Sequence, residues 1–298
     1  MKKAFVCRTL AGALLLAAAP VAAQDVEVEA GPPADPGIPA DSVLAGDFLT
    51  LGAGAAYTPS YQGSDDYVIS VLPAIVGSVG GIDVNPRAGG VTVDFIEDPR
   101  SGIGFDLGVA ARIRADRTSQ IEDEVVIQYG ELDTAIEVGP SVGVNYRGLL
   151  NPFDNISASL DVMFDVAGAH EGTVVTPSVS YTTPLSRAVL ASLTVNAEWT
   201  DENYRDYYFT VDPLNFIGPQ PDALPAFQAS GSGFKSIGAA TFVAIDLDGD
   251  VTNGGLGVVL LGGYSRLLGD AADTPFTSIR GSRDQFLGAI GLTYTFGL

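Results

Sequence analysis

Few side chains in this sequence have the types and spacing that catalysis requires. The only histidine, His170, lies in Ala167–Gly172, between two stretches of strand-like alternation, where a turn is expected. A hydrolase triad or His–Asp dyad would need this histidine beside a nucleophile or carboxylate at the outer rim of a barrel, and the predicted strand order puts the turn on the inner side. The only cysteine, Cys7, lies in a segment that is removed on export. We therefore expect no catalytic residues, and the protein is not expected to be an enzyme.

An acidic stretch near the C-terminal third invites a calcium interpretation. Asp246–Asp250 begins like an EF-hand loop, but its glycine, Gly249, falls at the fourth position instead of the sixth. The twelfth position is Gly257, where such a loop has a bidentate glutamate. The pattern favours a solvated turn.

A second acidic pair, Asp270 and Asp273, shares the segment Gly269–Asp284 with Arg280 and Arg283. We expect these carboxylates to pair with the arginines or with cations bound to lipopolysaccharide. The sequence thus predicts no metal site and no cofactor.

Aromatic side chains gather near the ends of expected strands. Amphipathic rings favour a membrane interface at such positions, although a surface that stacks on murein or glycan sugars is an alternative. The residues are Tyr57, Tyr61, Tyr67, Tyr204, Tyr207, Tyr208 and Phe209.

Composition narrows the class of protein. The chain has 298 residues, 46% of them apolar, with 36 glycines and a net charge of −21. Such an acidic surface repels nucleic acid, and the glycine-rich, methionine-poor usage is typical of β-structure with tight turns.

The N-terminus has the features of an export signal. Lys2, Lys3 and Arg8 precede the apolar run Leu10–Ala19 and the small residues Val21–Ala23, which together predict a signal peptide over 1–23. Residues 24–46 are rich in Pro, Asp, Glu and Ala and predict a flexible acidic periplasmic leader.

From 47 to 298 the sequence alternates with period two in long stretches. Ile103, Phe105 and Leu107 fall on one face, whereas Gly104 and Asp106 fall on the other. Segments of about 10 residues with one apolar and one polar or small face are typical of outer-membrane barrels, and soluble sandwiches use shorter strands. We therefore predict an all-β fold, a transmembrane antiparallel β-barrel of the outer-membrane type.

The predicted barrel has about twelve strands. They are Phe48–Tyr57, Tyr67–Gly77, Ile82–Ile96, Gly102–Ile113, Leu132–Arg147, Ile156–Ala169, Thr173–Thr183, Val189–Thr200, Tyr207–Asp212, Ser236–Leu247, Leu256–Leu267 and Phe286–Phe296. The even count puts both termini in the periplasm, and the aromatic closing strand resembles the signal that barrel-insertion machinery recognises. This order also puts Arg114–Glu131 on the inner side, as an unusual periplasmic loop or as a segment containing a missed strand at Val125–Tyr129.

Several segments resemble the MltA-interacting protein family, also called MipA/OmpV. They are Tyr61–Tyr67, Leu72–Pro73, Gly139–Pro140, Tyr146–Arg147, Asp201–Tyr204 and Tyr264–Pro275. The resemblance implies an outer-membrane scaffold that brings a periplasmic murein hydrolase together with a murein synthase. It implies no catalytic residues. The expected function is this noncatalytic scaffold, in contact with outer-membrane lipid and lipopolysaccharide, and the alternative is a narrow diffusion channel for small solutes.

Overall fold

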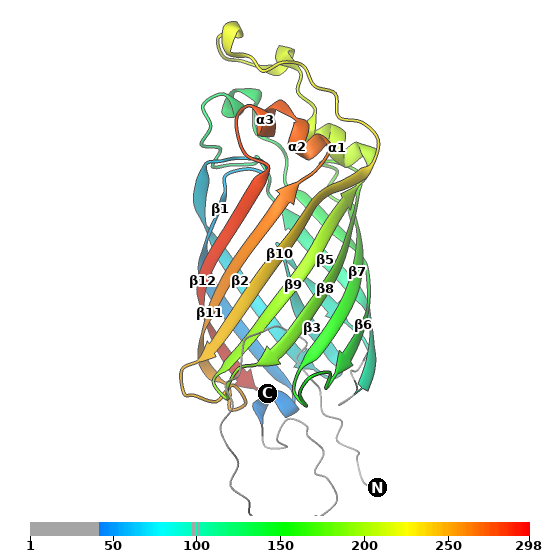
Figure 1. Ribbon diagram of the computed structural model, residues 1–298, viewed down its shortest axis with the longest axis vertical. Helices are drawn as coiled ribbons and strands as arrows, with labels where there is room; N and C mark the ends of the chain where they lie inside the picture. Colours follow the sequence, from blue (N-terminus) through cyan, green and yellow to red (C-terminus); the bar gives the residue numbers. More distant parts are fainter. Residues whose placement is uncertain (1–41, 97–98, 100–101) are drawn as a thin grey trace, which may run out of the picture.

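The structure is a computed structural model that describes residues 42–96, 99 and 102–298, in which twelve antiparallel strands close into one barrel (Figure 1). Every strand pairs with its neighbours in the sequence, and β12 closes the sheet by pairing with β1. The strands are β1 Phe48–Pro59, β2 Tyr67–Val79, β3 Ile82–Arg87, β4 Gly90–Asp94, β5 Gly102–Arg114, β6 Ala135–Arg147, β7 Asn155–Asp165, β8 Thr173–Pro184, β9 Val189–Thr200, β10 Gly233–Asp246, β11 Gly255–Leu267 and β12 Asp284–Gly297.

The alternation in the sequence becomes the two faces of the barrel wall. On β5, the apolar side chains of Ile103, Phe105 and Leu107 are exposed on the outside, whereas Gly104 and Ala110 are buried on the lumen side. An outward apolar face and a lumen with polar and small residues form the arrangement of a barrel in lipid. The predicted fold class is therefore confirmed.

Two of the twelve predicted strands are wrong, and their errors cancel in the count. The segment predicted as one strand, Ile82–Ile96, is the hairpin β3–β4, which turns at Ala88–Gly89 with Gly89 at φ +75°. The segment Tyr207–Asp212 is not a strand, because Tyr207–Phe209 belong to the helix α1, Glu202–Phe209. The hairpin was missed because its arms are only six and five residues long.

Because the hairpin adds one strand before β5, the connections from β4 to the start of α1 lie on the opposite side of the membrane from the side that the sequence predicts. The connections 60–66, 115–134, 166–172, 201–232 and 268–283 lie at the end opposite the start of β1 and the C-terminus (Figure 1). Outer-membrane barrels have short periplasmic turns and longer outer loops, so this is the outer end. The prediction that Arg114–Glu131 and the His170 turn lie on the inner side is therefore wrong.

Short turns join the strands at the periplasmic end, namely 80–81, 148–154, 185–188 and 247–254. Residues 42–46, which the sequence assigns to the leader, include the 3-10 helix η1, Val43–Ala45, and Ser42 donates a hydrogen bond to the Thr252 carbonyl at 2.8 Å. The predicted signal peptide and most of the leader lie outside the described residues. Within the described residues, no helix is long and apolar enough to cross a membrane.

Candidate functional site

The outer connections fold over the barrel mouth and form a cap, which we define as residues 60–66, 115–134, 166–172, 201–232 and 268–283. It contains α1, α2 (Asp270–Asp273), α3 (Pro275–Ser278) and the 3-10 helices η2 (Val126–Tyr129), η3 (Pro213–Asn215) and η4 (Gln220–Asp222). Figure 1 shows the three α-helices above the strand ends. The segment predicted as a possible strand, Val125–Tyr129, is mostly the helix η2.

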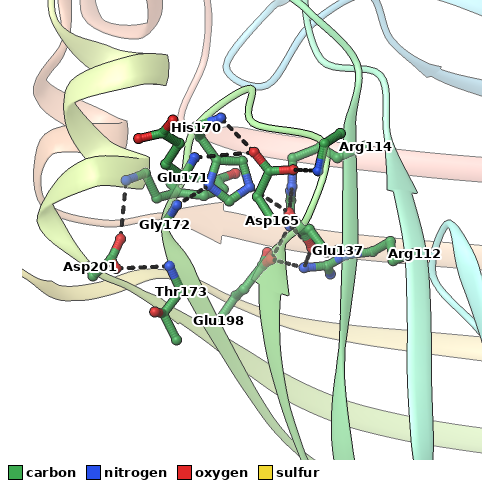
Figure 2. Close-up of polar contacts among 12 residues, drawn as sticks. Arg112, Arg114, Glu137, Asp165, His170, Glu171, Gly172, Thr173, Glu198 and Asp201 are labelled. Atoms are coloured by element: carbon green, nitrogen blue, oxygen red, sulfur yellow. Dashed lines mark hydrogen bonds and ion pairs between the residues drawn. The ribbon is translucent and has the colours of Figure 1, made fainter.

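Helix α1 is fixed by its N-cap. The Asp201 carboxylate accepts hydrogen bonds from the backbone N–H of Tyr204 at 3.1 Å and of Thr173 at 2.8 Å (Figure 2). A side-chain oxygen at this position satisfies a free N–H of the first turn, and the second bond ties the helix to the start of β8. Tyr204 and Tyr208, one turn apart, are both buried, because residues four apart share a helix face.

Two apolar clusters fill the cap. The α1 cluster consists of Val174, Tyr204, Tyr208, Phe209, Ala229, Leu267, Ala271 and Ala272. The Phe276 cluster consists of Tyr61, Ile121, Val126, Val211, Leu224 and Phe276. Arg117 links them, since its guanidinium donates to the Tyr208 carbonyl at 2.7 Å and lies 4.3 Å from the centre of the Phe276 ring.

Beneath α1, charged side chains cross the lumen and form what we call the lumen charge network: Arg112, Arg114, Glu137, Glu198, Lys235 and His170. Arg114 donates to Glu137 at 2.6 Å and to Glu198 at 2.5 Å, and Arg112 binds the same two carboxylates. The arginines come from β5 and Glu198 comes from β9, four strands away in the sheet order. These ion pairs therefore span the lumen instead of running along its wall.

His170 closes one side of this network. Its Nδ1 accepts a hydrogen bond from the Gly172 backbone N–H at 3.0 Å, and its Nε2 lies 3.2 Å from a Glu137 oxygen (Figure 2). Because Nδ1 accepts, the proton sits on Nε2, which donates to Glu137. The histidine is thus a structural donor to a carboxylate that already neutralises two arginines.

Lys235 completes the network from β10. It occupies a bulge, where the β9–β10 register shifts between Phe234 and Ser236, and the extra residue turns its side chain into the barrel. Its Nζ is 2.8 Å from Glu198 and 3.0 Å from Tyr204 Oη, and the whole residue is 0% exposed. A buried ammonium is tolerable only with such partners.

Burial in the cap also changes how its groups titrate. Removal from water raises the pKa of the Tyr204 and Tyr208 phenols well above the ordinary tyrosine value. The same cause lowers the pKa of the Arg117 guanidinium. The phenols therefore stay neutral over a wide range of pH.

The arrangement does not support nucleophilic catalysis. Gly139–Gly143 has the spacing Gly-x-Ser-x-Gly, but Ser141 lies in the middle of β6 instead of in a strand-to-helix turn, and its hydroxyl donates to Asp161 at 2.6 Å. The Nδ1 and Nε2 atoms of His170 are occupied by Gly172 and Glu137. In the described part of the chain, no group of three or more His, Cys, Asp or Glu side chains has the arrangement of a metal site.

The acidic side chains of the two segments stabilise loops through hydrogen bonds and ion pairs. Asp246 accepts from the backbone N–H of Asp248 and Asp250, at 2.9 and 3.0 Å, as the predicted turn requires. Asp273 lies 3.9 Å from Arg283, as expected. Its neighbour Asp270 pairs with Arg205 and Arg280 pairs with Asp123, which the sequence did not predict.

The aromatic residues divide into two groups. Tyr57 and Tyr67 stack with their ring centres 5.0 Å apart, and Tyr57 is exposed on the outside as an interface residue would be. The interface interpretation is wrong for Tyr61, Tyr204, Tyr208 and Phe209, which are buried in the cap clusters. The spacing of four residues between Tyr204 and Tyr208, after the N-cap residue Asp201, is the sequence signal that indicates a helix with one buried face.

Comparison with known proteins shows which structures the chain resembles and to which family it belongs. Among solved structures, it is similar to an outer-membrane channel from Pseudomonas putida F1 (11% identity, 90% of this chain and 100% of that chain, TM-score 0.41). It is also similar to OmpT of Vibrio cholerae, with 8% identity over 84% of this chain and 97% of that chain and a TM-score of 0.34. A third similar structure is the toluene transporter TbuX of Ralstonia pickettii, with 10% identity over 87% of this chain and 92% of that chain and a TM-score of 0.34. No curated protein matches it. The family model described as MltA-interacting protein MipA matches residues 51–296, so this outer-membrane barrel belongs to the MipA family.

Proposed function

We propose that this protein is a noncatalytic and non-conducting scaffold in the outer membrane, whose periplasmic end holds a murein-remodelling enzyme. The non-conducting part rests on the lumen charge network, because Arg112 and Arg114 reach across the lumen to Glu198 below a packed cap. We infer that these ion pairs obstruct solutes at this level of the lumen. The description of the family as MltA-interacting supports a murein enzyme as partner.

The turn 148–154 between β6 and β7 offers a docking surface at the periplasmic end. Leu150 is 77% exposed and Phe153 is 56% exposed. The Asp154 carboxylate accepts from the backbone N–H of Leu149 at 2.6 Å and of Leu150 at 2.8 Å. A turn that is rigid and apolar at once supports protein contact more than an ordinary solvated turn would.

A pull-down with a periplasmic lytic transglycosylase tests the scaffold. We expect the Leu150→Asp/Phe153→Asp variant to lose most of the capture and to keep heat-modifiable migration on a gel, which reports a folded barrel. Leu214→Asp is the matched control, because Leu214 is 88% exposed at the outer end. Equal capture by all three proteins would remove the 148–154 turn from the interface, and no capture by the unmodified protein would overturn the scaffold.

A narrow diffusion channel is the second candidate, supported by the partly exposed hydroxyl groups of Ser159, Ser178 and Ser180 in the lumen below the cap. Conduction would require the cap to move. Single-channel recording in planar bilayers separates the candidates. The scaffold proposal expects no conductance steps at neutral pH, and reproducible steps would favour the channel.

A further inference from the structure

The barrel wall is interrupted between β2 and β3. Strand β2 pairs with β1 from Tyr67 to Ser78, but with β3 only over Gly77–Val79. Elsewhere in the sheet, two adjacent long strands share at least nine residue pairs, as β8 and β9 do. The ten residues Tyr67–Val76 therefore have a ladder partner on one side only.

The sequence explains why the ladder stops. If the β2–β3 register continued, Pro86 would face Ile75, and Pro73 stands two residues further along β2. Proline has no N–H to donate and is confined to strand edges. On the outer face, Val71 is 82% exposed and Ile69 is 68% exposed, consistent with the lack of a neighbouring strand.

The interruption has defined borders, and we call it the window. Below, it ends at the Gly77–Val79 ladder with β3. Above, it ends where the Gln62 backbone N–H donates to the Asp116 carboxylate at 2.8 Å. On the far side lie the β3–β4 hairpin tip and the end of β5, joined by the Ile113 N–H to Gly89 carbonyl bond at 3.0 Å.

An unpaired strand edge is costly in hydrocarbon. Each backbone group without a partner costs several kcal/mol there, and such edges persist only where they are buried in protein or line a water-filled space. The lumen side of the window supplies that space, because the inward residues of β2 nearest to it, such as Leu72 and Val76, are neither buried nor packed into the cap clusters.

The lumen wall is divided at the same place. The inward positions in the middle of β10, β11, β12, β1 and β2 are mostly apolar or glycine, namely Ala240, Phe242, Ala244, Val259, Leu261, Leu287, Ala289, Gly291, Gly52, Gly54, Ala56, Leu72, Ala74 and Val76, with Ser70 and Thr293 as polar exceptions. Those of β3 to β9 are mostly polar, namely Asn85, Arg87, Thr92, Asp94, Asp106, Ser141, Asn145, Ser159, Asp161, Ser178, Ser180, Thr194 and Asn196. The lumen thus has an apolar half and a polar half, and the window lies on the boundary between β2 and β3.

We propose that the window admits a single-chain amphiphile from the membrane into the lumen. The alkyl chain lies against the apolar half, along Phe242, Leu261 and Leu287. The head group lies against the polar half, where the Asp94 carboxylate lies on the inner face of β4 and Arg87 is already paired with Asp161 at 3.0 Å. This charge balance selects neutral or cationic head groups over anionic ones.

Binding can be measured with the mature protein in vesicles and an alkyltrimethylammonium probe that carries a nitroxide on its chain. We expect the electron paramagnetic resonance spectrum to show a saturable, immobilised component of about one probe per barrel. Leu72→Lys places a charge in the apolar half and should weaken this component by roughly tenfold or more. Ser119→Lys, in the outer connection 115–134 and away from the lumen wall, should change it by less than about threefold. A shell of boundary lipid on the outer surface would respond to neither substitution.

The route can be tested by closing the window. In the continued register Val76 faces Asn85, so a Val76→Cys/Asn85→Cys disulfide would bridge the window in a mature chain that otherwise has no cysteine. Oxidation should slow immobilisation of the probe, and reduction should restore it. The control pair is Ser159→Cys/Ser178→Cys, on a complete ladder where the two hydroxyls are 2.8 Å apart.

Each outcome decides the proposal. Absence of a saturable component, or equal effects of Leu72→Lys and Ser119→Lys, overturns the lumen site. Unchanged kinetics in a window variant whose crosslink is confirmed by mass spectrometry overturns lateral entry, and if that disulfide does not form, Val71→Arg at the outer edge of the window must slow entry for the route to stand. None of these assays involves a murein enzyme, so they succeed or fail independently of the scaffold.

Discussion

At the scale of single residues, the lumen charge network is the feature on which closure of the outer end depends. Glu137 is 0% exposed and neutralises Arg112 and Arg114 while accepting from His170. Breaking a buried pair by removing one partner typically costs about 3–5 kcal/mol, because the remaining charge stays buried. Period-two alternation puts Arg112, Glu137 and Glu198 on the polar faces of predicted strands, whereas Arg114 and His170 fall in predicted connections. The pattern cannot show that β5, β6 and β9 bring these residues to one level, since register depends on the whole sheet.

Replacing Glu137 with Ala should therefore lower the free energy of unfolding by about 3–5 kcal/mol. Urea titration in vesicles, followed by the fluorescence of the single tryptophan, Trp199, measures this change. Asp284→Ala is the control, because Asp284 pairs with Arg266 at the surface and such pairs are worth about 1 kcal/mol or less. Equal effects of the two variants would show that the network is not important for stability.

Alkaline pH should loosen the cap, because the buried phenols bind their protons more tightly in the folded state. Burial raises the pKa of Tyr204, so its contribution to stability is complete below the unfolded value of about 10 and is lost as the pH rises through the folded value. Titration of tyrosinate absorbance should show delayed ionisation in the unmodified protein, with a smaller delayed fraction in Tyr204→Phe. Simultaneous ionisation of all eleven tyrosines in folded protein would contradict this expectation.

At the scale of elements, the long strands were predictable and the short ones were not. Period two over Ile103–Ile113 is unambiguous because one face is apolar throughout. In Ile82–Asp94 the same alternation runs through both arms of a hairpin, and the turn at Ala88–Gly89 is shorter than the pattern can resolve. Helix α1 was missed because tyrosines are common in strands, although Asp201 is a good N-cap.

The direction of the strand faces can be tested on β5. Leu107 is 51% exposed on the outside, so Leu107→Arg should cost about 2–4 kcal/mol near the bilayer midplane. Asp106→Ala, on the lumen side, should be milder. Urea titration of both variants in vesicles measures the difference, and equal costs would contradict this register.

At the scale of the whole molecule, the hairpin β3–β4 decides which loops face the outside. A cysteine at Ser119, which is exposed in the outer connection 115–134, should react with a membrane-impermeant maleimide on intact cells. A cysteine at Ser186, exposed in the short turn 185–188, should react only after the outer membrane is permeabilised. The reverse pattern would show that the barrel has the opposite orientation in the membrane.

The cap also sets an order of events during folding. Its contacts join residues far apart in the chain, as where Tyr61 Oη donates to the Phe276 carbonyl at 3.1 Å across 215 positions. Contacts of such sequence separation form late, because the entropy of closing the intervening chain must be met first. The first and last strands must pair before the cap can assemble, so a newly inserted barrel passes through an uncapped stage. Protection of the cap from external protease should consequently appear after heat-modifiable migration does.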